Sequence, residues 1–156
     1  MKNPKLLILI ISILSLLGCG TENGAGMTRN VSAMSKHAEV TLALKDVTPI
    51  SATVTIYNGS AADISYGSQY KFILEKQTDG IWYVCERATR TADGCHITAT
   101  DVECVLESGL TDEYEISWDF LYGNLPAGKY RFIKEIETAA SPSSTGDPFA
   151  TEFEIK

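Results

Sequence analysis

The feature that most constrains this chain is a repeated alternation of apolar and polar residues, which dominates the sequence after His37. A period of two is what a half-buried β-strand requires, because successive side chains point to opposite faces of a sheet. The alternating runs cover residues 40–44, 52–57, 70–75, 81–85, 102–106, 115–120, 129–137 and 149–155. The pattern therefore predicts short strands rather than long amphipathic helices.

The apolar positions of these runs predict which side chains face a core. Ala52, Val54 and Ile56 alternate with polar residues, so we expect them to point inward. Three other sets are also expected inward: Val40, Leu42 and Leu44; Tyr70, Phe72 and Leu74; and Ile116, Trp118 and Phe120. Lys71, Ile73 and Glu75 alternate with the second of these sets, so they are expected on the opposite, solvent-facing side.

Turn residues separate the runs. Asp79-Gly80 is a dipeptide typical of a tight hairpin turn, and Pro126-Ala127-Gly128 is expected to turn the chain into the run at 129–137. Seven to eight short strands with turns between them predict an all-β fold in which two antiparallel sheets pack as a sandwich. We expect this domain to cover residues 38–156.

The N-terminus has the layout of a signal peptide. Lys2 and Lys5 precede an apolar run over residues 6–17, and small residues follow. The run is shorter than the roughly 20 residues that a stable membrane-spanning helix needs. We therefore expect residues 1–18 to be removed rather than kept as a transmembrane anchor.

The end of the apolar run, Leu16-Leu17-Gly18-Cys19, resembles the lipobox of bacterial lipoproteins. The resemblance implies that Cys19 carries fatty acids such as palmitate and becomes the new N-terminus. The mature chain would then be lipid-anchored at the extracytoplasmic face of the cell membrane. Several acyl chains at one site anchor firmly, because each buried CH₂ contributes about 0.8 kcal/mol. The alternative is an ordinary secretory signal that contains a cysteine.

Residues 19–37 are expected to form a lipidated tether. The segment after Cys19 is rich in Gly, Ser, Thr, Asn and Ala and has no sustained apolar periodicity. A flexible chain of this length spans only about 25 Å, so the domain would stay near the membrane. The chain carries a formal net charge of −7. Such a charge is repelled by phosphate backbones, which makes nucleic acid an unfavourable partner.

Several segments together resemble a bacterial immunoglobulin-like domain found in small lipoproteins. The most specific segment is residues 125–131, Leu-Pro-Ala-Gly-Lys-Tyr-Arg, which would lead into a penultimate strand. The other segments that carry the resemblance are Tyr57-Asn58, Tyr66-Gly67, Tyr70 with Leu74 and Glu75, Trp82 after Asp79-Gly80, and residues 149–155. The resemblance implies an immunoglobulin-like β-sandwich but no catalytic residues or cofactor. A looser similarity exists to small proteinase-inhibitor sandwiches.

No set of residues suggests catalysis. The chain has two histidines, His37 and His96, and neither accompanies a nucleophile motif. We therefore expect a protein that is not an enzyme. The acidic groups around Asp112 and Glu135 lack the spacing of a calcium loop, so we interpret them as solvated strand positions.

Three cysteines, Cys85, Cys95 and Cys104, lie in the predicted domain. With His96 they could supply three sulfurs and one nitrogen to zinc, but their spacing lacks the tight pairs of structural zinc sites. Export favours a disulfide instead. We expect Cys85 to pair with Cys104, because both lie at strand ends, and Cys95 to be the odd thiol.

The sequence therefore favours a non-catalytic interaction domain displayed at the membrane and contacting a protein partner through loops or a sheet edge. Two alternatives stay open: a small-molecule or metal-binding lipoprotein, and a proteinase inhibitor. The aromatic residues bear on this choice, since they could line a ligand groove but in a sandwich are more often core. These residues are Trp82, Trp118, Tyr66, Tyr70, Tyr114, Tyr122 and Tyr130.

Overall fold

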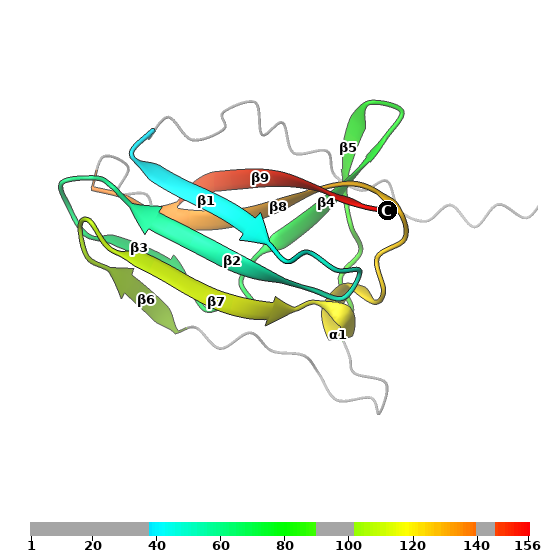
Figure 1. Ribbon diagram of the computed structural model, residues 1–156, viewed down its shortest axis with the longest axis horizontal. Helices are drawn as coiled ribbons and strands as arrows, with labels where there is room; N and C mark the ends of the chain where they lie inside the picture. The colour runs from blue at the N-terminus through cyan, green and yellow to red at the C-terminus, as the bar shows by residue number, and fades with distance from the viewer. Residues whose placement is uncertain (1–37, 90–101, 140–145) are drawn as a thin grey trace, which may run out of the picture.

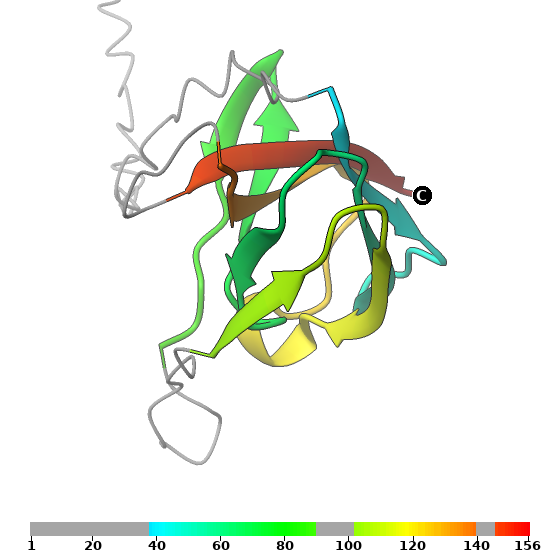
Figure 2. The same ribbon diagram turned by 90° about the vertical axis from the view of Figure 1, so that its left-hand side faces the viewer.

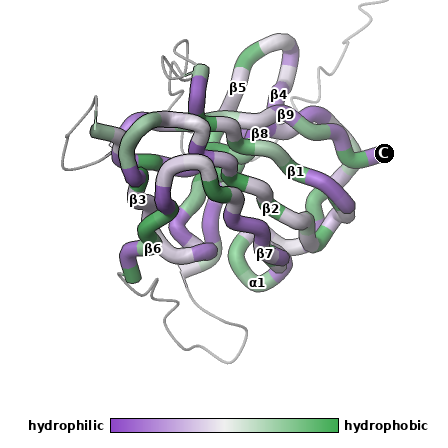
Figure 3. The backbone as a smooth tube through the Cα atoms, turned by 60° about the vertical axis from the view of Figure 1, so that its left-hand side comes forward, coloured by the Kyte–Doolittle hydropathy of each residue, from purple (hydrophilic) through white to green (hydrophobic). Residues whose placement is uncertain are grey.

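The computed structural model describes residues 38–89, 102–139 and 146–156. These ranges contain nine strands and one short helix, and the strands form two antiparallel sheets packed face to face (Figure 1). The prediction of an all-β sandwich is confirmed. Apolar and polar residues alternate along the strands, as the changes of colour along the backbone show (Figure 3).

The smaller sheet has the order β1 (Val40–Lys45), β2 (Ser51–Asn58) and β7 (Thr111–Ser117). Its strands lie together on one side of the sandwich (Figure 1). The buried apolar side chains of this sheet are Val40, Ala52, Val54, Ile56 and Ile116. The inward positions predicted for β2 are thus confirmed.

The larger sheet is built around β8 (Gly128–Glu137), which pairs from Gly128 to Ile136 with β9 (Asp147–Ile155). The four other strands of this sheet are β3 (Ile64–Gly67), β4 (Ile73–Thr78), β5 (Ile81–Val84) and β6 (Glu103–Leu106). A turn at Asp79-Gly80 joins β4 to β5, and both turn residues have positive φ angles, as the hairpin prediction requires. This hairpin projects beyond the body of the sandwich (Figure 1).

The registers show that β3 and β4 occupy the same edge of β8. Tyr130 of β8 pairs with Phe153 of β9 on one side and with Lys76 of β4 on the other. Ile136, nearer the end of β8, pairs with β9 on one side and with Tyr66 of β3 on the other. Because a strand has only two edges, β3 and β4 follow one another along the edge opposite β9. They act as one strand interrupted at residues 68–72.

The same reasoning places β5 and β6 on the same side of the sheet, at its two ends (Figure 1 and Figure 2). β5 pairs with β4 and β6 pairs with β3, each on the side away from β8. Reading across the sheet therefore gives β9, β8, then β3 with β4, then β6 with β5. Together with the order β1-β2-β7, this matches the G-F-C-C′ and A-B-E sheets of immunoglobulin-like sandwiches.

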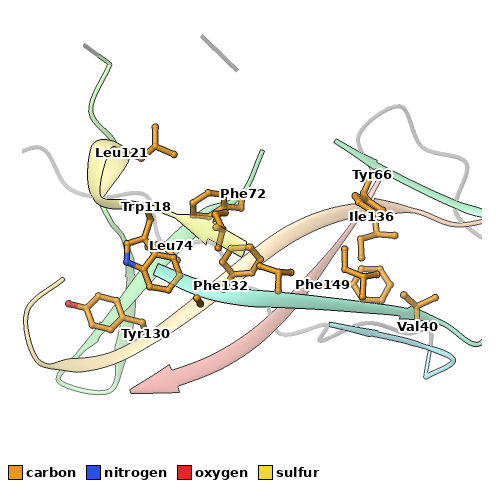
Figure 4. Close-up of a cluster of buried hydrophobic side chains, with 14 of the residues drawn as sticks. Val40, Tyr66, Phe72, Leu74, Trp118, Leu121, Tyr130, Phe132, Ile136 and Phe149 are labelled. Atoms are coloured by element: carbon orange, nitrogen blue, oxygen red, sulfur yellow. The ribbon is translucent and has the colours of Figure 1, made fainter. Parts of the chain in front are cut away.

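Buried aromatic side chains, mostly from the larger sheet, fill the core (Figure 4). Trp118 and Phe132 are completely buried, and Tyr130 is 1% exposed. Phe72 stacks on Phe132 with ring centroids 4.9 Å apart, and Phe153 stacks between Trp118 and Tyr130. The interpretation of the aromatic residues as core is confirmed for most of them. Trp82 differs, because it lies outside this core.

The run predicted at 115–120 is only partly a strand. β7 ends at Ser117, and the chain then forms a one-turn helix, α1 (Asp119–Tyr122). The carboxylate of Asp119 accepts hydrogen bonds from the hydroxyl of Ser117 and the amide of Phe120, which favours a turn there. Trp118 is buried as predicted, but Phe120 is 38% exposed. The prediction that Phe120 faces the core is therefore wrong.

Two further differences concern β3 and β4. The strand at β3 was not expected, because it is only four residues long and lies between turn-forming residues. Glu75 was expected on a solvent-facing side, yet its side chain is completely buried. Tyr70, expected within a strand, precedes β4 and contacts the ring of Phe120 edge-on, with centroids 5.1 Å apart.

Candidate functional site

The candidate site is the outer edge of the larger sheet, formed by β5 and β6, which we call the free edge. Within the described ranges neither strand pairs with any strand beyond the sheet. Ile81 and Tyr83 of β5 are 49% and 40% exposed, and Val105 of β6 is 66% exposed. Val102, just before β6, is 55% exposed. This edge therefore combines unpaired backbone with exposed apolar side chains.

Neither strand of the free edge carries a lysine or a proline, although β6 begins with the charged residue Glu103. Natural edges are blocked by lysine, proline or bulges, because an open edge pairs readily with another chain. β5 reads Ile-Trp-Tyr-Val and β6 reads Glu-Cys-Val-Leu. Their shortness limits pairing, but their composition permits it. Strand addition is a common way for a sheet to bind an extended segment.

Acidic residues flank the exposed valine on β6. Glu103, Val105 and Glu107 alternate with inward residues and are all exposed, so they share the outer face of the sheet. On the same face Val105 pairs with Ser65, and Ser65 pairs with Glu137. This row of three residues crosses three neighbouring strands and ends at the carboxylate of Glu137.

A hollow of about 230 Å³ lies beside this row, and we call it the edge hollow. It is lined by Asp63, Ile64, Ser65, Val105, Glu137 and Thr138. Two of its lining side chains are carboxylates and none is cationic. The hydroxyl of Thr138 is buried and, among the described residues, has no hydrogen-bond partner. The edge hollow is thus acidic.

A buried ion pair holds the β4–β5 hairpin to β8. Arg131 Nε donates a hydrogen bond to Glu75 Oε2 at 3.0 Å, and the Arg131 side chain is only 6% exposed. The ring of Trp82 covers the guanidinium, with its centroid 4.4 Å from Cζ. Burial strengthens such an ion pair but makes the loss of either partner costly. The cluster therefore fixes the hairpin that carries half of the free edge.

Lys134 closes the interruption between β3 and β4. Its completely buried side chain donates hydrogen bonds to the carbonyls of Gly67 and Ser68 at 2.9 and 3.0 Å, and to that of Lys71 at 3.4 Å. Burial lowers the pKa of Lys134 to about 8, against smaller opposing effects from nearby Cys104 and Asp112. The ammonium thus replaces the strand pairing that is absent at this point.

Side chains also join the two sheets near the free edge. The Tyr66 hydroxyl of β3 donates a hydrogen bond to Asp112 Oδ2 of β7 at 2.5 Å. Burial, followed by this carboxylate, raises the pKa of Tyr66. At the end of β2, buried Asn58 donates to the carbonyls of Ala62 and Leu106 at 2.9 and 3.0 Å. These bonds hold β3 and β6 in place beneath the candidate site.

The predicted bridge between Cys85 and Cys104 is not formed, since both are free thiols. The amide of Cys85 donates to the carbonyl of Leu74, whereas Cys104 pairs with Tyr66. Leu74 and Tyr66 pair with positions four residues apart on β8, which is about 14 Å along a strand. A disulfide needs Cα atoms within roughly 7 Å. Cys85 directly follows β5 and Cys104 is the second residue of β6, and sequence reasoning could not supply the spacing between them.

Other predicted positions lie outside the described residues: Cys19, His37, Cys95 and His96. Within the described ranges, no three metal-ligating side chains come together. No helix in those ranges has the length and hydrophobicity of a membrane-spanning segment. Of the predicted solvated acids, Glu113 is half exposed and pairs with Lys45 at 2.7 Å.

A second hollow, of about 430 Å³, lies beside β2 and β7. Tyr70, Asp46 and Glu115 line it together with hydroxyl residues of both strands. Glu115 is exposed and Tyr70 is half-buried. No buried polar atom without a partner belongs to this lining. We therefore regard the free edge as the stronger candidate.

The start of β8 carries a signature of this class of sandwich. The Tyr130 hydroxyl donates a hydrogen bond to the Pro126 carbonyl at 2.7 Å, which is the arrangement called a tyrosine corner. With the sheet order, this defines an immunoglobulin-like β-sandwich. The chain belongs to the bacterial Ig-like domain family, whose model matches residues 34–153. No match was found among curated proteins.

Proposed function

We propose that this protein is a membrane-anchored surface lipoprotein whose immunoglobulin-like domain binds a protein partner without catalysing a reaction. The observation that carries the proposal is the free edge, with Val105 66% exposed on an edge strand whose outer side pairs with no described strand. Membership of the bacterial Ig-like family supports the non-catalytic part of the proposal. The lipobox-like segment that ends at Cys19 supports the membrane anchor.

The strands beside the free edge are held rigidly, which suits binding of a partner. The Glu75–Arg131 pair, the Lys134 ammonium and the Tyr66–Asp112 bond all hold strands next to the free edge. A rigid surface loses little conformational entropy when it binds, which favours affinity. The acidic residues around Val105 favour a partner of opposite charge and raise its rate of association.

A crosslinking experiment in the native cell tests this proposal. A photoreactive amino acid would replace Val105 in the full-length protein, and the matched control would carry it at Thr41, which is exposed on β1 of the other sheet. We expect a specific protein adduct from position 105 and none from position 41. Adducts from position 41 alone, or none from either position, would contradict the proposal.

A further inference from the structure

Acidic and apolar side chains alternate along the outer face at β6, where a strand added beside β6 would contact them. Glu103 and Val105 are exposed on the outer face of β6, and exposed Glu107 follows directly after the strand, at the next position of the same alternation. A strand added beside β6 would place every second side chain on this face. Residues opposite each other in a ladder interact, favourably when their charges are opposite and unfavourably when they are alike.

We propose that the free edge at β6 binds an extended segment of a protein partner in which basic residues alternate with an apolar residue, in the order basic-x-apolar-x-basic. The apolar side chain would lie against Val105, and the basic side chains would lie opposite Glu103 and Glu107. This proposal rests on the proposed function and specifies the chemistry of its partner.

The edge hollow supports the same charge for the partner. Asp63 accepts a hydrogen bond from the amide of Ser108 at 3.2 Å, which places its carboxylate beside Glu107. The hollow is lined by the carboxylates of Asp63 and Glu137, with no cationic side chain among its lining residues. A lysine or arginine extending from the added strand would pass its apolar stem over Val105 and bring its cation to these oxygens.

A second copy of this chain suits the edge poorly. If two β6 strands paired antiparallel about Val105, Glu103 of each would lie opposite Glu107 of the other. Like charges in such positions are destabilising, and the net charge of −7 adds repulsion between the two molecules. The charge pattern therefore disfavours this pairing of two copies and favours a basic strand.

Binding of synthetic peptides to the full-length protein in detergent micelles tests the proposal. One peptide would contain the pattern Lys-Thr-Val-Thr-Lys, and the matched peptide would have Glu in place of each Lys. We expect the basic peptide alone to bind, more weakly as salt rises. On binding, hydrogen exchange of the β6 backbone amides should slow.

Two variants with the same change of net charge distinguish specific recognition at β6 from general electrostatic attraction. The variant E103K/E107K should bind the basic peptide at least about tenfold more weakly and should gain binding of the acidic peptide. The control E115K/E154K makes the same change of net charge at exposed glutamates on β7 and β9, and it should bind as the wild type does.

Equal loss of binding in both variants, or no binding of the basic peptide to the wild type, would overturn the proposal. If the peptides fail while position 105 still crosslinks to a protein in the native cell, strand addition by a basic segment is wrong and the proposed function stands. If both experiments fail, the free edge is not the binding surface.

Discussion

The hydroxyl of Tyr130 lies 2.7 Å from the carbonyl oxygen of Pro126, four residues earlier, and donates a hydrogen bond to it. The Tyr130 ring also packs in the core and is 1% exposed. One side chain thus fixes the turn at 126–128 to the start of β8. This explains physically why the segment from Leu125 to Arg131 carried the strongest family resemblance in the sequence.

Replacing Tyr130 with Phe should destabilise the domain by about 1 kcal/mol, the usual net contribution of one hydrogen bond. The ring would still fill its place in the core, so the loss should be confined to the bond. Chemical denaturation measures the change. Tyr57→Phe, at a 42% exposed position, is the control and should leave the midpoint unchanged. Equal effects of the two changes would contradict the role of the corner.

Replacing Trp118 with Ala should destabilise the domain by about 3 to 5 kcal/mol, as truncation of a buried aromatic does. Trp118 is completely buried, and its Nε1 donates a hydrogen bond to the Pro49 carbonyl at 3.0 Å. Phe120→Ala is the matched control on the neighbouring helical turn, and we expect an effect of about 1 kcal/mol. Thermal melting of both variants checks the difference. A melting temperature unaffected by loss of Trp118 would refute its burial.

Replacing Arg131 with Met should destabilise the domain by about 3 to 5 kcal/mol, because Glu75 would be left as an unpaired buried carboxylate. The exposed pair of Lys45 and Glu113 provides the comparison. Glu113→Ala should leave stability almost unchanged, since exposed pairs contribute little. Urea denaturation of the two variants measures the contrast, and similar losses would show that burial of Glu75 is not the cause.

The stability difference between the wild type and Lys134→Met should depend on pH. In the folded state the pKa of Lys134 is lowered to about 8 by burial, from 10.5. Between these values the unfolded chain keeps the proton that the folded state has lost, so rising pH favours folding of the wild type. Its stability relative to the variant should therefore increase between about pH 8 and 10.5, by at most about 1.4 kcal/mol per pH unit.

Lys129→Met provides the control for this pH dependence, because Lys129 lies on the same strand and is exposed. The stability difference between the wild type and this control should stay flat over the same range. Guanidinium titrations at several pH values measure both differences. A flat difference for Lys134→Met as well would show that its ammonium is not desolvated.

Replacing Cys19 with Ala should abolish lipidation and processing of the precursor, because the thiol that would accept the lipid is absent. Metabolic labelling with a palmitate analogue measures this in the native cell. Cys85→Ala, which leaves the lipobox-like segment intact, should keep the label and the processed size. Label retained by the Cys19 variant would exclude this cysteine as the anchor.

The main features of the fold were predictable from short-range patterns. Alternation in β2 identified Ala52, Val54 and Ile56 as core, and Asp79-Gly80 identified a hairpin, because both depend only on neighbouring residues. The helical turn at α1 was not predictable in the same way. It has four residues, too few for a helical period to appear beside the strand period.

The candidate site was less predictable, because it depends on contacts between distant residues. Charged Glu75 and Lys134 carry no sequence signal of burial, and each is buried only because a partner elsewhere in the chain satisfies it. The free edge likewise follows from the order of strands across the sheet. Sequence reasoning predicted contact with a partner through loops or a sheet edge, but it could not say which edge is free.

The position of β5 and β6 on one edge has an evolutionary consequence. The chain leaves the sheet after Val84 and returns to the same side of it at Glu103, and between them the amide of Ala88 donates a hydrogen bond to the carbonyl of Leu121 in α1. Doubling the length of a connection costs only about 0.6 kcal/mol. Descendants of this chain can therefore change the number of residues between Ala88 and Glu103 and keep the pairing of both sheets. This gives selection a place to vary what the domain recognises while the fold is inherited unchanged.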